Sequence, residues 1–186
     1  MKQLILLFCF LVAGIFSLNA QCTWTGAVNT NWSEAGNWSC GHVPGAADDV
    51  VININNSIVT LDVADITISS LDISNSSTLT GNYDVLINGD LTCTSASLSG
   101  TDAMTVEGTA SLSYLSLYTR NLIINGGGTC NGGLSMYNNA TLTIPALQIL
   151  TVVGELTNFN SDGEIINHGT IEKNGVGELS LFGIVL

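Results

Sequence analysis

Residues 85–93 read VLINGDLTC, and four later stretches of the chain repeat the same pattern. In every copy the first position is apolar and the fifth is glycine. The copies begin 19, 18, 28 and 15 residues apart, a spacing too short for a helical repeat or a propeller blade. A glycine at a fixed position fits a tight corner, where a Cβ would obstruct the bend. The later copies are MTVEGTASL (104–112), LIINGGGTC (122–130), LTVVGELTN (150–158) and IINHGTIEK (165–173).

From Asp49 onward, apolar and polar residues alternate in short runs such as DVVININ and DITISSLDIS. This period of two, interrupted by Asn, Asp, Ser and Gly, predicts short strands joined by turns. Together with the repeat, it predicts an all-β fold, a β-solenoid with two or three strands in each coil. A β-sandwich is the alternative, since it also shows evenly spaced strands. The 28-residue step predicts an additional loop around SMYNNATLTIPALQI (135–149).

The N-terminus has the features of a secretory signal peptide. Lys2 precedes an apolar run that ends at Phe16, and small residues follow. We expect cleavage after Ala20, which divides the chain into a signal peptide (1–20), an N-terminal cap (21–48) and solenoid coils (49–186). No later run is long enough for a membrane span, so we expect a secreted or outer-surface protein with no membrane insertion after signal cleavage. Lipidation of Cys22 is the disfavoured alternative, because Gln21 precedes it.

Charge excludes several classes of function. The chain has 15 acidic residues, and only Arg120 and Lys173 are basic once the signal peptide is removed. Nucleic acid, acidic polysaccharide and anionic membrane surfaces are therefore unlikely partners. A lyase that acts on acidic sugars needs cationic groups, and a glycoside hydrolase needs two carboxylates across a groove. Asp48 and Asp49 are adjacent in a predicted strand and would face opposite sides. We therefore expect no enzymatic activity.

All three tryptophans lie in the stretch CTWTGAVNTNWSEAGNWSCG (22–41), before the first regular strand. The first coil of a solenoid exposes a strand edge and the end of an apolar column, which must be covered. We therefore predict that Trp24, Trp32 and Trp38 cover this end. The competing interpretation is that their rings stack on a sugar, which makes them candidates for carbohydrate contact.

The cysteines of the exported chain predict one disulfide. Cys22 and Cys40 bracket the tryptophans, and a bridge between them would stabilise this irregular loop by roughly 3 kcal/mol. Cys93 and Cys130 occupy the same repeat position, with Leu112 between them. Two coils of about 4.8 Å each separate them by more than the roughly 7 Å that a disulfide tolerates. We predict that they are buried thiols.

Neither histidine stands in a metal-ligand pattern, and no cofactor is expected apart from a candidate calcium ion. In NFNSDGE (158–164), Asn158, Asn160 and Asp162 stand at the first, third and fifth positions of a calcium loop. The twelfth position is Gly169 instead of glutamate, which favours an asparagine-rich turn. A second candidate set comprises Asp48, Asp49, Asp62 and Asp65.

Two stretches resemble known families. One family is the adhesin-like surface proteins of Gram-negative bacteria that are secreted by the type IX route. Two stretches resemble it, WTGAVNTNWSEAGNWSCGHVPGAADDVVI (24–52) and NATLTIPALQILTVVGELTNFNSDGEIINHGTIEKNG (139–175). This resemblance implies a right-handed parallel β-helix exported through a Sec signal, often with a C-terminal sorting domain. Residues 43–73 also resemble the start of the extracellular eight-glycine domain, a β-solenoid-like unit linked to carbohydrate binding.

The sequence therefore predicts a secreted, non-enzymatic, adhesin-like structural or binding module whose partner is a surface carbohydrate or a protein. The alternative is a carbohydrate-binding or carbohydrate-active β-helix. The final stretch LSLFGIVL (179–186) is apolar, and an uncovered strand edge recruits other strands. We therefore also expect self-association through the C-terminal strand edge.

Overall fold

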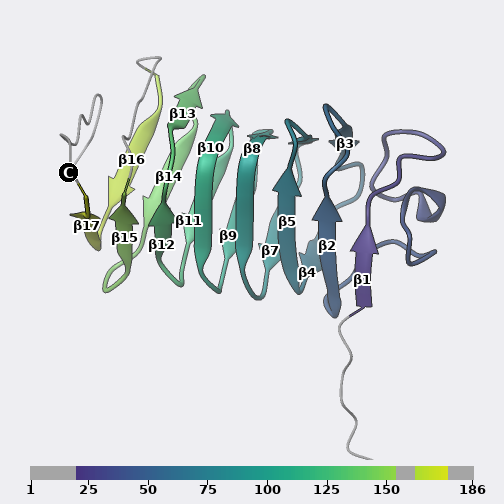
Figure 1. Cartoon of the computed structure of the whole chain (residues 1–186), viewed down its shortest axis with the longest axis horizontal. Helices are drawn as coiled ribbons and strands as arrows, with labels where there is room; N and C mark the ends of the chain where they lie inside the picture. The colour runs from purple at the N-terminus through teal and green to yellow at the C-terminus, as the bar shows by residue number, and fades with distance from the viewer. Residues whose placement is uncertain (1–19, 154–161, 176–186) are drawn as a thin grey trace, which may run out of the picture.

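The computed structural model describes residues 20–153 and 162–175, and this part of the chain is a parallel β-solenoid of about six turns (Figure 1). Every pairing between its strands is parallel. The described residues contain no α-helix and one 3-10 helix, η1 (Ala35–Asn37). The predicted solenoid is confirmed, and the sandwich alternative is wrong.

Strands one coil apart form three faces, and the first of these runs the length of the molecule (Figure 1). Two of its strands are long enough to turn a corner and continue into the second face. The first face contains β1 (Ala20–Thr23), β2 (Asp48–Ile52), β5 (Ser70–Ser74), β8 (Leu91–Ser99), β10 (Ala110–Tyr118), β12 (Gly128–Cys130), β15 (Ile149–Val152) and β17 (Thr170–Lys173).

The second face is short, and the third closes each coil behind the first (Figure 1). The second face consists of β3 (Ile58–Thr60), β6 (Thr78–Thr80), the C-terminal parts of β8 and β10, and β13 (Leu134–Tyr137). The third face consists of β4 (Ile66–Ile68), β7 (Val85–Ile87), β9 (Ala103–Val106), β11 (Asn121–Ile124), β14 (Thr141–Ile144) and β16 (Glu164–Asn167).

The core is a set of columns in which each inward side chain packs on its equivalent in the next coil. Alternation along a strand sends every second residue inward, as the buried positions of β2 and β4 show. In the register, Leu112 lies between Cys93 and Cys130, and both cysteines are buried free thiols. The prediction for these two residues is confirmed. Their column contains Ile52, Ile73, Cys93, Leu112, Cys130 and Val152.

The fifth position of the repeat stacks at a corner between the third and first faces. A Cβ on Gly108 would lie 2.5 Å from the carbonyl carbon of Gly89. A Cβ on Gly126 would overlap the backbone carbonyl of Gly108. Successive corners therefore approach each other so closely that only backbone fits between them, which explains the fixed glycine.

One part of the predicted register is wrong. Leu142 pairs with Leu122, whereas Leu150 pairs with Gly128 on a different face. Residues 135–149 are therefore not an additional loop, because they contain most of β13 and all of β14. The corner that contains residues 145–148 is longer than its equivalent one coil earlier, since six residues separate Thr143 from Leu150 and four separate their partners Ile123 and Gly128.

Several expectations lie outside the described residues. The predicted signal peptide falls almost wholly in residues 1–19, and the apolar stretch expected to self-associate falls in residues 176–186. Within residues 20–153 and 162–175, no helix is long and apolar enough to span a membrane.

Candidate functional site

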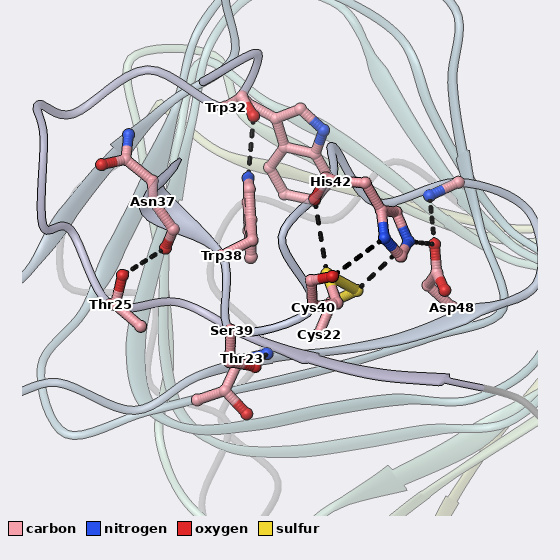
Figure 2. Close-up of a disulfide and its surroundings, with 11 residues drawn as sticks. Cys22, Thr23, Thr25, Trp32, Asn37, Trp38, Ser39, Cys40, His42 and Asp48 are labelled. Atoms are coloured by element: carbon pink, nitrogen blue, oxygen red, sulfur yellow. Dashed lines mark hydrogen bonds and ion pairs between the residues drawn. A yellow bond between two sulfur atoms is a disulfide. The ribbon is translucent and has the colours of Figure 1, made fainter. Parts of the chain in front are cut away.

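The three tryptophans form a buried cluster at the N-terminal end of the solenoid. Trp38 is central, since its ring meets Trp24 at 4.9 Å and Trp32 at 4.7 Å in edge-to-face geometry. Its indole Nε1 donates to the carbonyl oxygen of Trp32 at 2.8 Å (Figure 2). The three residues are between 1% and 3% exposed. They cover the core as predicted, and the expectation that their ring faces stack on a sugar is wrong, because those faces are buried.

The cap also covers two strand edges. Along β1, Thr23 makes two hydrogen bonds with Ser39: its carbonyl oxygen accepts from Ser39 N, and its N–H donates to the Ser39 hydroxyl oxygen, both at 2.9 Å. Along β3, Trp32 N donates to Thr60 O at 2.8 Å, and Thr60 N donates to Thr30 O at 2.7 Å. These edges are therefore unavailable to an incoming strand.

Asn37, at the end of η1, organises the loop that precedes it. Its buried side-chain Oδ1 accepts from the backbone N–H groups of Val28 and Asn29, at 2.9 and 3.1 Å. Its Nδ2 donates to Asn29 Oδ1 and to Asn31 O, both at 2.9 Å. One amide thus fixes four groups of the loop. Sequence reasoning missed Asn37, which looks like any other residue of an asparagine-rich segment.

The Cys22–Cys40 disulfide holds the two ends of the cap together and confirms the predicted pairing (Figure 2). His42 lies beside it, with Nε2 3.1 Å from Asp48 Oδ2 and 3.8 Å from Cys22 Sγ. Cys22, Cys40 and His42 are the sole group of three potential ligands close enough for one metal ion in the described residues. Both sulfurs are joined in the disulfide, so neither is the thiolate that metal binding requires.

The calcium candidates are not brought into one site. Asp48 Oδ2 accepts from Gly45 N at 2.8 Å, and Asp49 Oδ1 accepts from Ser70 Oγ at 2.7 Å, on opposite sides of β2. Asp62 accepts from the backbone and the hydroxyl of Ser33. These carboxylates therefore serve turns and neighbouring strands.

The other candidates follow the same pattern or fall outside the description. Asp65 is an exposed turn residue with a φ of 57°. Among the described residues, no group of three acidic side chains lies close enough to share an ion. Asn158 and Asn160 lie outside the described residues, and Asp162 lies inside them.

Arg120, one of the three basic residues of the chain, is fully buried at a corner of the solenoid. Its guanidinium donates to the carbonyl oxygens of Gly81, Tyr83, Ser99 and Asp102, which belong to two preceding coils. Burial lowers the pKa of Arg120, and the negative charges of Asp102 and Asp84 oppose this effect. A side chain held in this way binds the fold together and does not reach a substrate.

A hollow of about 210 Å³ opens where the cap meets the corner between β2 and β3. Its lining combines hydroxyl and amide groups with two exposed isoleucines, and none of its residues is acidic, basic or a cysteine. Such a lining can supply hydrogen bonds and apolar contact to a ligand. The hollow is lined by Trp24, Thr25, Gly26, Asn29, Thr30, Ile54, Ser57 and Ile58.

Comparison with known proteins places this cap and most of the solenoid in a family. No curated protein and no solved structure matches the chain. A family profile described as a domain of unknown function, DUF8693, matches residues 23–125. The match covers more than half of the 186 residues, from the first residues of the cap through β11, and includes the hollow and Arg120. The chain therefore belongs to the DUF8693 family.

Proposed function

We propose that this protein is a non-enzymatic, adhesin-like binding module that acts outside the cytoplasm, secreted or on the cell surface. The observation that carries the proposal is the hollow beside the cap, which is lined by uncharged polar and apolar groups. A rigid solenoid supports it, and a disulfide pins the loop that forms one of its sides. This arrangement suits recognition of a ligand, since recognition needs a preformed surface and no reacting group.

The setting outside the cytoplasm is supported by the disulfide and by the signal-like N-terminus. Disulfides persist in oxidising compartments and are rare in the cytosol. The acidic composition, with formal net charge −12, disfavours nucleic acid and anionic lipid as partners. A surface carbohydrate or a protein ligand is therefore the proposed partner.

The alternative function, a carbohydrate-active enzyme, has weaker support. A glycoside hydrolase places two carboxylates across its substrate site, and no carboxylate lines the hollow. Arg120 is committed to backbone carbonyls, and His42 is paired with Asp48 beside the disulfide.

The test is to express the full chain in a Gram-negative host and recover it from outside the cytoplasm. Intact mass should show loss of residues 1–20 and one disulfide. The purified protein is then offered a panel of neutral glycans and host-cell proteins, with binding and product release measured in parallel. We expect saturable binding without turnover. Glycan cleavage would overturn the non-enzymatic proposal, and a protein retained in the cytoplasm would overturn its location.

A further inference from the structure

We propose that the hollow binds an uncharged sugar residue through the indole N–H of Trp24, the amide of Asn29 and the aliphatic side chains of Ile54 and Ile58. This inference rests on the proposed binding function and adds the class of ligand and the residues that contact it. It differs from stacking on tryptophan faces, because those faces are buried and only an edge of Trp24 contributes.

Trp24 supplies the first reason. The residue is 2% exposed, yet it lines the hollow, and its Nε1 has no hydrogen-bond partner among the described residues. Nε1 is also the atom nearest to where a Cβ on Gly26 would lie, at 3.1 Å. Gly26 has a φ of 58° and no side chain, so it leaves this edge of the ring uncovered. A nearly buried donor that opens onto a hollow has a place for an acceptor from a ligand.

Asn29 and Thr30 add donors beside that edge. Asn29 Oδ1 is occupied, since it accepts from Asn31 N at 2.8 Å and from Asn37 Nδ2 at 2.9 Å. The Nδ2 group of Asn29 has no partner in the described part of the chain and can donate to a ligand. The Thr30 hydroxyl accepts from Thr60 Oγ1 at 3.3 Å, so its own proton is also available.

Ser57 and the two isoleucines complete the site from the opposite side. The Ser57 hydroxyl donates to Ser77 Oγ at 3.1 Å, which leaves its oxygen free to accept. Ile54 and Ile58 are 41% and 52% exposed and present methyl groups. Sugars offer hydroxyls that both donate and accept, together with C–H faces that pack on aliphatic groups. The absence of charge in the lining fits a neutral sugar and disfavours uronic or sialic acids.

The surroundings and the size of the hollow favour a sugar over an extended peptide. Peptides commonly bind as an added strand on a free sheet edge, but the cap already pairs the nearby edges of β1 and β3. A volume of about 210 Å³ is below the range of roughly 300–1,000 Å³ typical of sites for drug-sized ligands. The hollow therefore suits one terminal residue of a longer glycan.

The experiment titrates the full exported chain with neutral oligosaccharides of glucose, galactose and mannose, and follows tryptophan fluorescence together with calorimetry. All three tryptophans lie in the cap, so a fluorescence change reports binding at this end of the molecule. We expect Asn29→Asp, which keeps the occupied oxygen and removes the amide donor, to weaken binding about threefold to tenfold. Ile58→Ser should weaken it by a similar factor.

Two matched variants control for charge and for lost apolar surface. Asn131→Asp adds the same charge at an exposed asparagine outside the hollow, and Leu147→Ser removes an apolar side chain that is 95% exposed at another corner. Both should bind as the parent chain does. A uronic acid oligomer serves as the charged probe and should bind more weakly than its neutral counterpart.

Each other outcome overturns a defined part of the proposal. If a neutral oligosaccharide binds but Asn29→Asp and Ile58→Ser leave its affinity unchanged, the hollow is wrong and the binding function stands. Tyr118→Ala, at an exposed tyrosine that stacks on Tyr137 at 4.6 Å, then tests whether the site lies on the second face. If only a protein or peptide binds, the sugar is wrong. If no panel member binds, both proposals fail.

Discussion

The thiols of Cys93 and Cys130 face the core in one column, on either side of Leu112. Burial raises the pKa of Cys93 far above its ordinary value, and the negative charge of Asp72 raises it further. Burial also raises the pKa of the Cys130 thiol, and a backbone hydrogen bond with Gly132 opposes part of this rise. Both thiols are therefore harder to deprotonate in the folded protein than in the unfolded chain.

This burial predicts a dependence of stability on pH. Each thiol has a higher pKa folded than unfolded, so its stabilisation is fully present below the unfolded pKa of about 8.5 and is lost as pH rises above it. Between pH 7 and pH 9.5 the free energy of unfolding should fall by about 1 kcal/mol through Cys93, and Cys130 should add a fall in the same direction. Urea denaturation of the parent chain and of Cys93→Ala/Cys130→Ala measures this difference. Equal slopes with pH in the two proteins would contradict it, as would rapid reaction of the native thiols with a disulfide reagent.

Single residues also mark the limit of inference from sequence. The burial of the tryptophans was predictable, because the first coil of a solenoid leaves the end of its apolar core open and three large rings precede that coil. The roles of Arg120 and Asn37 were not, since each depends on carbonyl or amide groups brought close by the coil geometry. The order of residues along the sequence does not indicate such contacts.

The corners of the coils decide where strands end and which face follows. At the bend between the first and second faces, Ser95 within β8 and Tyr114 within β10 have φ values of 51° and 53°. These left-handed residues turn each strand through the corner, and β8 and β10 keep the same register before and after it, from Ser113 beside Thr94 to Leu115 beside Ala96. At the corner after the third face, glycines meet backbone to backbone instead.

Element geometry therefore predicts a sharp difference between two glycine substitutions. Gly126→Ala places a methyl group against the backbone carbonyl of Gly108, which cannot move without disturbing the next coil. Overpacking of this kind should lower the free energy of unfolding by about 1 to 3 kcal/mol.

Gly45→Ala is the control, because its Cβ would meet nothing closer than 3.9 Å and its φ is not in the left-handed region. Thermal and urea denaturation should show the control close to the parent chain. Equal destabilisation by the two substitutions would show that the glycine corner is not a close backbone contact.

The register error shows why elements are predictable before their neighbours are. The stretch at Leu150 has an apolar first position and a glycine at the fifth, as the repeat requires. It nevertheless lies on the first face, because the longer corner 145–148 and an extra residue between β12 and β13 shift the faces along the chain. Local pattern specifies a strand and a corner, whereas pairing depends on the summed lengths of all corners in a coil.

At the scale of the whole molecule, the solenoid is a one-dimensional stack in which a coil pairs with the coil before it and the coil after it. The hollow could not be predicted from the sequence, because one of its sides comes from the cap and the other from a corner near 54–58. The stacking of coils brings these two segments together. Arg120 is an exception to nearest-neighbour contact. It joins its own coil to carbonyls at Gly81 and Ser99, in the two coils that precede it.

This contrast predicts how damage spreads along the stack. Loss of the disulfide in Cys22→Ser/Cys40→Ser should destabilise the cap by about 3 kcal/mol in the chain-entropy model. Because the strands of a coil pair only with strands of adjacent coils, amide hydrogen exchange should accelerate in β1 to β3 and remain slow in β9 to β11.

Arg120→Met should accelerate hydrogen exchange in the middle of the stack and leave the cap unchanged. It leaves four buried carbonyls without their donor, so protection should fall together in β6, β8 and β10, by at least about 3 kcal/mol, while the cap keeps its protection. Lys173→Gln, which removes a basic residue in β17, is the control and should leave exchange in β6, β8 and β10 unchanged. If the disulfide variant and Arg120→Met both accelerate exchange equally along the whole chain, the solenoid unfolds as one unit and the nearest-neighbour description is wrong.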